Sequence, residues 1–194
     1  MFFSEWIEVL LGRARRRMVS VTLVQGLKSL VIAAVLSGFL LGVHIFLAVY
    51  LDLSTIWIIL IYPVLSLLSA IISVLIFGIL IHLVAKLLGG KGQPKNFIGA
   101  LALISAAILG ILFSTLEVLY IIAALLGSQA YSVIDSVTIL WTILAGIWLL
   151  FLLFRAIKDI YRLPIGKALF VIFALFLIFV ALTIILNIVL ALFL

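Results

Sequence analysis

The stretch FIGALALISAAILGILFSTLEVLYIIAALL, residues 97–126, contains a single charged residue, Glu117, in an otherwise apolar run. A helix needs roughly 20 predominantly apolar residues to cross the hydrocarbon core of a bilayer. Residues 97–126 exceed that length and contain no proline. The stretch therefore predicts a transmembrane helix that carries one carboxylate inside it.

The composition of the whole chain extends this prediction to the rest of the protein. The 194 residues are 69% hydrophobic and 9% charged, whereas soluble domains are about half apolar and a quarter charged. A chain of this size cannot hide so much apolar surface inside a water-soluble fold, so we expect the bilayer to be its solvent. The sequence contains no cysteine, which excludes disulfides, cysteine-based zinc sites and thiol catalysis.

Four further stretches meet or approach the length that a bilayer requires. We expect an all-α, polytopic membrane protein with a bundle of five transmembrane helices. Residues 1–22 would form an amphipathic, basic N-terminal segment, and residues 23–194 the transmembrane domain. The expected spans are about 23–50, 55–85, 97–126, 133–154 and 167–193.

The basic residues predict how this bundle is oriented. All twelve Lys and Arg residues fall on one side of it: before or at the start of the first span, between the second and third, and between the fourth and fifth. The opposite loops carry Asp52 and Asp135 instead. By the positive-inside rule, the N-terminus is cytoplasmic and the C-terminus lies outside.

The N-terminal segment has two possible roles at the cytoplasmic surface. Residues 2–11 gather their polar side chains on one side of a helix, a pattern typical of a short helix in the headgroup region. The basic residues that follow could bind anionic headgroups, at about 1 kcal/mol each near the surface. Alternatively, they only determine the topology. These residues are Arg13, Arg15, Arg16 and Arg17.

Small residues indicate where the helices approach one another in lipid. The third span repeats a small residue every four positions, at Ala102, Ala106, Gly110 and Ser114. Glu117 follows Ser114 by three residues, which places it on the same face and toward the bundle. A carboxylate that faces lipid costs about 2.5–3.5 kcal/mol, so the inward position is favoured. The first span carries similar rows, which predict a bundle centred on spans one and three.

The helical rise places several other polar residues in the same outer half of the membrane as Glu117. Such residues could form a hydrogen-bonded or ion-binding site with Glu117 and His44 at its centre. They could equally form a polar contact that only sets helix register, or lie on different faces. The expected members of this polar intramembrane cluster are Glu117, His44, Asn187, Tyr62 and Thr138.

No residue pattern in the chain supports enzymatic chemistry. The two histidines, His44 and His82, belong to opposite sides of the membrane, which excludes a His-Glu-x-x-His metal site. The loop GGKGQPKN lacks the spacing of a phosphate-binding loop, and no Gly-x-Ser-x-Gly motif occurs. We therefore expect no catalytic residue, metal site or cofactor. The basic residues report orientation, so no nucleic-acid partner is expected either.

Two short segments carry a resemblance to a known family. HLVAKLLGGKG, residues 82–92, follows the second span, and LFRAIKDIYRLPIGKALFVI, residues 153–172, joins the fourth to the fifth. With five spans and an internal N-terminus, this layout resembles the Yip1 family of integral membrane proteins, over roughly residues 20–190. The family's Gly-Gly-Lys-Gly-like loop and the end of its last connecting turn are matched by Gly89, Gly90, Lys91, Gly92, Lys167 and Ala168.

The resemblance implies a protein of membrane traffic, whose eukaryotic relatives associate with Rab-type GTPases. This chain has only some twenty residues before its first span, where those relatives have a long cytosolic region. It also lacks the proline expected midway along the third span. These departures argue against GTPase binding. The short form resembles a prokaryotic member, in the cell membrane.

Two functional hypotheses follow. The first is a non-enzymatic, membrane-organising or trafficking-type scaffold that contacts anionic lipid or protein partners, a second copy included, through its basic cytoplasmic face. The second is a small transporter or ion-binding membrane protein that uses the polar cluster around Glu117. A third, an intramembrane enzyme without a recognised motif, has no residue pattern in its support.

Overall fold

The computed structural model describes residues 2–13, 15–50 and 56–193, and within these ranges the chain is helical with no strand. Five helices are long and apolar enough to cross a membrane, as the sequence predicts. The elements are α1 (Phe2–Leu10), α2 (Arg15–Ser20), α3 (Leu23–Ile45), η1 (Phe46–Tyr50), α4 (Trp57–Leu87), α5 (Pro94–Ala107), η3 (Ile108–Phe113), α6 (Ser114–Leu126), α7 (Ser128–Tyr161) and α8 (Ile165–Phe193).

The helix of the fourth span, α7, is longer than the expected range of residues 133–154. Gly127, at a φ of 99°, ends α6, and α7 begins at the next residue and continues to Tyr161. Such a positive φ suits glycine, which lacks the Cβ that disfavours it in other residues. Asp135, which we expected in the outer loop region at the edge of the fourth span, lies well inside α7. Asp52 lies outside the described residues.

The centre of the bundle is the contact between the first and third spans, as the small-residue rows predict. Gly26 of α3 packs directly against the carbonyl oxygen of Gly99 of α5, leaving no room for a side chain at either backbone. Further along α3, Gly38 lies against the backbone of Tyr62 and Pro63 of α4. Ten of the fourteen α5 residues are buried, which makes α5 the core of the fold.

The N-terminal helix α1 packs against the bundle, and its expected place in the headgroup region stays a prediction. Trp6 is 3% exposed, its ring covers Gly110 of η3, and its indole Nε1 donates to Ser29 Oγ at 2.6 Å. Trp148 Nε1 of α7 donates to the Leu10 carbonyl at 2.7 Å. Part of the apolar surface of α1 is therefore buried against the third span.

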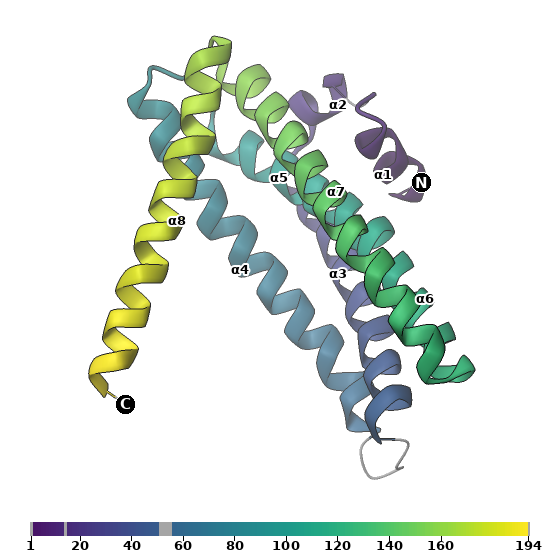
Figure 1. Cartoon of the computed structure of the whole chain (residues 1–194). Helices are drawn as coiled ribbons and strands as arrows, with labels where there is room; N and C mark the ends of the chain where they lie inside the picture. Colours follow the sequence, from purple (N-terminus) through teal and green to yellow (C-terminus); the bar gives the residue numbers. More distant parts are fainter. Residues whose placement is uncertain (1, 14, 51–55, 194) are drawn as a thin grey trace.

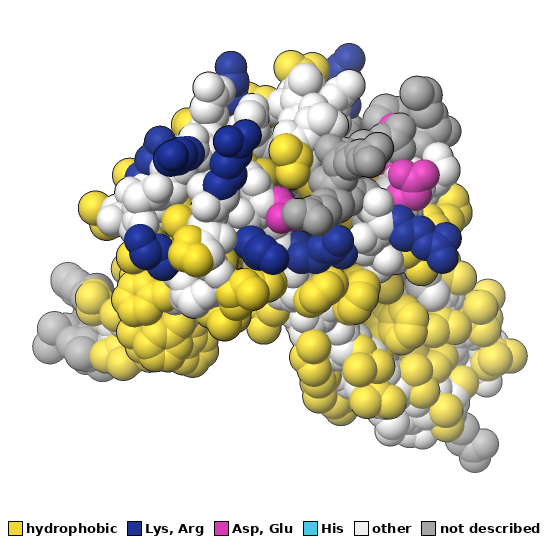
Figure 2. Space-filling model, turned by 90° about the horizontal axis from the view of Figure 1, so that it is seen from above, with side chains coloured by type: hydrophobic (Ala, Val, Ile, Leu, Met, Phe, Trp, Pro, Cys, Tyr) yellow, Lys and Arg dark blue, Asp and Glu magenta, His cyan; other side chains and the backbone are white. Residues whose placement is uncertain are grey.

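The basic end of the molecule holds the connections from α4 to α5 and from α7 to α8. Lys91 N donates to the Tyr161 carbonyl at 3.0 Å, and Gly90 and Gly92 pack against the Tyr161 side chain. From this junction α8 runs away from α4 and α7 toward the other end of the molecule (Figure 1). Lys and Arg side chains gather over the face seen from above in Figure 2, with hydrophobic side chains below it.

Candidate functional site

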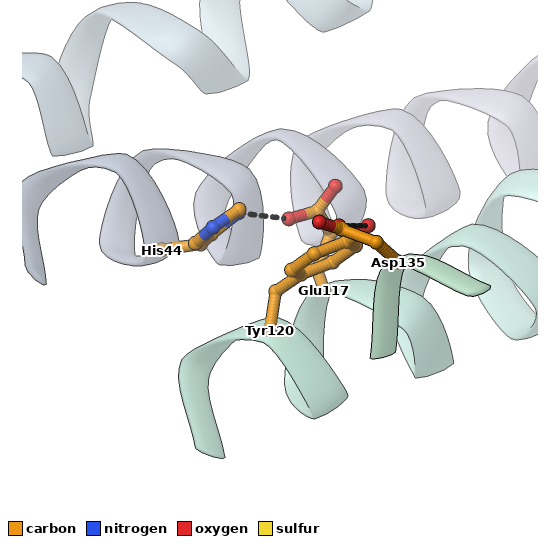
Figure 3. Close-up of polar contacts among 4 residues, drawn as sticks. All are labelled: His44, Glu117, Tyr120 and Asp135. Carbon is orange, nitrogen blue, oxygen red and sulfur yellow. Dashed lines mark hydrogen bonds and ion pairs between the residues drawn. The ribbon is translucent and has the colours of Figure 1, made fainter. Parts of the chain in front are cut away.

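The structure brings together the two residues placed at the centre of the expected cluster. His44 Nδ1, in the last turn of α3, lies 3.0 Å from Glu117 Oε2 of α6 (Figure 3). The two side chains are 17% and 16% exposed. Gly42 faces Ile59 of α4, and two residues turn a helix by about 200°, so His44 points away from α4 and toward α6.

Aromatic rings cover this pair. Tyr120, one turn after Glu117 on α6, stacks on the His44 imidazole with centroids 4.9 Å apart and planes 14° from parallel. The ring centroid of Tyr131, from α7, lies 6.4 Å from that of His44 and 6.2 Å from that of Tyr120. Three helices thus contribute to one compact site at the end of the bundle opposite the basic residues.

A second carboxylate joins the site through Tyr120. The Tyr120 hydroxyl donates to Asp135 Oδ1 of α7 at 2.8 Å (Figure 3). Asp135 is exposed, whereas Glu117 is largely buried. The site therefore links the exposed Asp135 to Tyr120 by a hydrogen bond. The Tyr120 ring stacks on His44, and His44 contacts the largely buried Glu117.

Two further hydroxyls of the site have no partner. Tyr131 Oη and Thr138 Oγ1 are buried and make no hydrogen bond to any described residue. Thr138 lies one turn after Asp135 on α7. A buried hydroxyl without a partner costs about 1–3 kcal/mol. Both oxygens can therefore accept or donate one more hydrogen bond.

The His44–Glu117 contact has the chemistry of a proton-binding site. An imidazolium can donate to the carboxylate, or the two groups can share the proton as a neutral imidazole and carboxylic acid. Both arrangements leave the pair without net charge, which a low-dielectric environment favours over a lone ion. Adding or removing one proton makes the pair charged, so the arrangement can take up and release a proton.

Two of the expected members lie elsewhere. Tyr62 belongs to α4, whose contacts with Gly38 and Gly42 lie on the opposite side of α3 from His44. Asn187 is exposed on α8 and its amide donates to the Thr183 carbonyl of its own helix at 2.8 Å. α8 packs on α4 and α7 and its end lies far from α6 (Figure 1). Similar depth therefore did not bring these residues together.

Sequence reasoning did not include Tyr120, Tyr131 and Asp135 in the site. Tyr120 had a usable signal, because it follows Glu117 by three residues and so lies on the same helix face. Asp135 was assigned to the outer loop region at the edge of the fourth span, so it was not counted among the members of the cluster.

The expected headgroup-binding residues are described only in part. Arg13 is exposed, and the side chains of Arg15, Arg16 and Arg17 lie outside the described part of the structure. Beside this segment, Arg155 Nη1 of α7 donates to the Gly12 carbonyl at 2.8 Å, and its guanidinium lies 5.8 Å from the centroid of the Phe151 ring. Arg155 thus holds the basic segment against the bundle.

Within the described ranges, no three His, Asp or Glu side chains are arranged to hold a metal ion. Comparisons of the chain with protein-family models, curated proteins and solved structures find no match.

Proposed function

We propose that this chain is a non-enzymatic, multi-pass membrane protein that binds and releases a proton at the His44–Glu117 site. The observation that carries the proposal is the 3.0 Å contact between two ionisable groups on membrane-spanning helices. Ionisable residues within such helices are costly and commonly belong to ion or proton sites. A small cation could use the same carboxylate, but the aromatic covering of the pair favours the proton.

The residues around the His44–Glu117 pair favour proton access from one side of the membrane only. Asp135 and Tyr120 connect the pair to the end without basic residues, where Asp135 is exposed. In the other direction, α5 is packed with buried apolar and small residues. With the basic end in the cytoplasm, as the positive-inside rule favours, the site exchanges protons with the outside.

Such a site would make the packing of the outer half depend on external pH. A protonation change that leaves the His44–Glu117 pair charged weakens the contact between α3 and α6. We infer a proton-responsive or proton-coupled membrane protein, in which this pair is the group that titrates.

The chain offers a direct test because it contains only two histidines. With 15N-labelled histidine, nuclear magnetic resonance of the protein in proteoliposomes reports His44 and His82 separately. We expect the His44 signal to respond to external pH, because His44 Nδ1 lies 3.0 Å from the Glu117 carboxylate. Glu117→Gln should change this response, while the His82 signal remains unchanged as the internal control.

Two results contradict this proposal. One is a His44 signal that does not respond between pH 4 and 9, roughly the range over which histidine and carboxyl groups titrate in proteins. The other is a titration curve that is identical in wild type and in Glu117→Gln. If the His44 signal responds to internal pH but not to external pH, the site still binds a proton, but its assignment to the outer side of the membrane is wrong.

A second candidate function is the membrane-organising scaffold implied by the resemblance to the Yip1 family, in a prokaryotic cell membrane. The gathering of Lys and Arg side chains over one face supports it (Figure 2). In nanodiscs of mixed phosphatidylcholine and phosphatidylglycerol, native mass spectrometry should show retained phosphatidylglycerol. Replacing the four N-terminal arginines by alanine should reduce this retention, and replacing them by lysine should not. Equal retention by all three proteins would count against the scaffold.

A further inference from the structure

Three helices of the bundle, α4, α7 and α8, are joined near the basic end and line a cleft. At the junction, His82 Nδ1 of α4 lies 2.9 Å from the Tyr161 hydroxyl of α7, and Lys167 Nζ of α8 donates to the Leu88 carbonyl at 2.9 Å. The buried side chains of Tyr161 and Ala168 close this end. Away from the junction α8 separates from α4 and α7 (Figure 1).

Two connected cavities occupy the space between these helices. The first, of about 350 Å³, is lined by apolar side chains of α4, α7 and α8, with Phe77 on one wall and Phe176 and Phe179 on another. The second, of about 280 Å³, continues along α4. Both are bordered by Ser73 of α4 and Ser105 of α5, so they form one cleft.

The second cavity is lined by four serines. Ser66, Ser69 and Ser73 lie on one face of α4, and Ser105 of α5 joins them. None of these four hydroxyls makes a hydrogen bond to a residue that the structure describes. Hydroxyls in membrane helices commonly bond to the preceding turn of their own helix. Three others in this chain do so: Thr115, Ser136 and Thr183 donate to the carbonyl four residues earlier.

The charge and depth of the cleft indicate what it can hold. No Lys, Arg, Asp, Glu or His side chain lines either cavity. Ser73 lies within one residue of the middle of the α4 span, Trp57–Leu87. The hydrocarbon core is about 30 Å thick, so this position is about 15 Å from either headgroup region. A charged headgroup therefore has no counter-ion there, whereas an uncharged oxygen can bond to the serines.

We propose that the cleft binds a neutral, bilayer-soluble amphiphile: an apolar chain or ring system that carries a carbonyl or hydroxyl group. The apolar part of the ligand occupies the first cavity, which is lined by Phe77, Phe176 and Phe179. The carbonyl or hydroxyl oxygen of the ligand accepts hydrogen bonds from Ser73 and Ser105. The cavity volumes fall in or near the range of small-molecule sites, about 300–1,000 Å³. This site is separate from the His44–Glu117 pair, so its failure leaves the proposed proton site untouched.

The test uses ubiquinone-2, a neutral quinone with a short isoprenoid tail, as the probe for the purified full chain in nanodiscs. We expect saturable retention of the quinone, and at least tenfold weaker binding by the Ser69→Ala, Ser73→Ala, Ser105→Ala triple variant, because each neutral hydrogen bond contributes appreciably to affinity. The matched control replaces Thr115, Ser136 and Thr183 by alanine, removing three hydroxyls that already bond to their own helices. It should bind like wild type.

A second variant fills the cleft rather than removing its hydroxyls. Ser105→Phe should abolish quinone retention while the protein keeps its helical content and melting temperature. Retention unchanged by either variant, or equal retention of squalene, a hydrocarbon without oxygen, overturns the proposal. A third result also overturns it: the wild-type protein retains no quinone and forms a dimer, and Ser73→Phe separates that dimer. A second copy of the chain would then fill the cleft.

Discussion

His44 and Glu117 are 73 residues apart in sequence, yet their Nδ1 and Oε2 atoms lie 3.0 Å apart between the first and third spans. Each group alone would leave an ionisable side chain without a partner in a largely apolar setting. Together they connect α3 to α6, and Tyr120 and Asp135 extend the connection to α7.

The first prediction concerns the stability of this pair. His44→Phe alone and Glu117→Leu alone should each lower the free energy of unfolding by about 1–3 kcal/mol, because each leaves one buried polar partner unsatisfied. The double variant should cost less than the sum of the two, since no orphaned group remains. Unfolding in detergent mixtures measures all three. If the costs of the two single variants simply add in the double variant, the His44–Glu117 contact contributes nothing to the free energy of unfolding.

A second prediction addresses Tyr120 and Asp135. Tyr120→Phe keeps the ring that stacks on His44 and removes the hydroxyl that donates to Asp135. We expect a loss of about 0.5–1.5 kcal/mol, and no further loss when Asp135→Asn is added. Thermal unfolding of the single and double variants measures this coupling. A larger loss in the double variant would show that Asp135 acts independently of Tyr120.

The third prediction tests how α1 is anchored. A side chain at Gly110 would meet the Trp6 ring, so Gly110→Leu should displace α1 and expose residues 1–20 to protease. The displacement also loses the Trp6–Ser29 hydrogen bond. Gly146 provides the control, because a Cβ there meets nothing within 4 Å. Gly146→Ala should leave the cleavage rate unchanged; equal protection in Gly110→Leu would contradict the packing of α1 on η3.

A fourth prediction concerns the contact between α3 and α5. Gly26→Ala introduces a Cβ where the Gly99 carbonyl lies, so the two helices must separate. Overpacking of this kind costs about 1–3 kcal/mol, which a lower melting temperature would reveal. The matched change, Gly166→Ala near the start of α8, meets no atom within 4 Å and should have little effect. Similar melting temperatures for both variants would argue against a tight helix contact.

The number of membrane-spanning helices and the packing of α3 on α5 could be predicted from the residues themselves. Both depend on local properties: the length of an apolar run against the thickness of a bilayer, and the recurrence of small residues on one helix face. The inward position of Glu117 followed from the same periodicity. The nearly constant helical rise also gave each residue an expected depth in the membrane, which stays a prediction.

What the sequence by itself determined is therefore the position of each residue along its own helix and the face on which it lies. Only the tertiary structure decided which helices are neighbours, and so which residues at one depth meet. His44 reaches Glu117 because α3 packs on α6, while Asn187, which was expected at a similar depth, lies on α8 and bonds to its own helix. The physical reason is that rise and periodicity are properties of one helix, whereas lateral position depends on close packing between segments far apart in the chain.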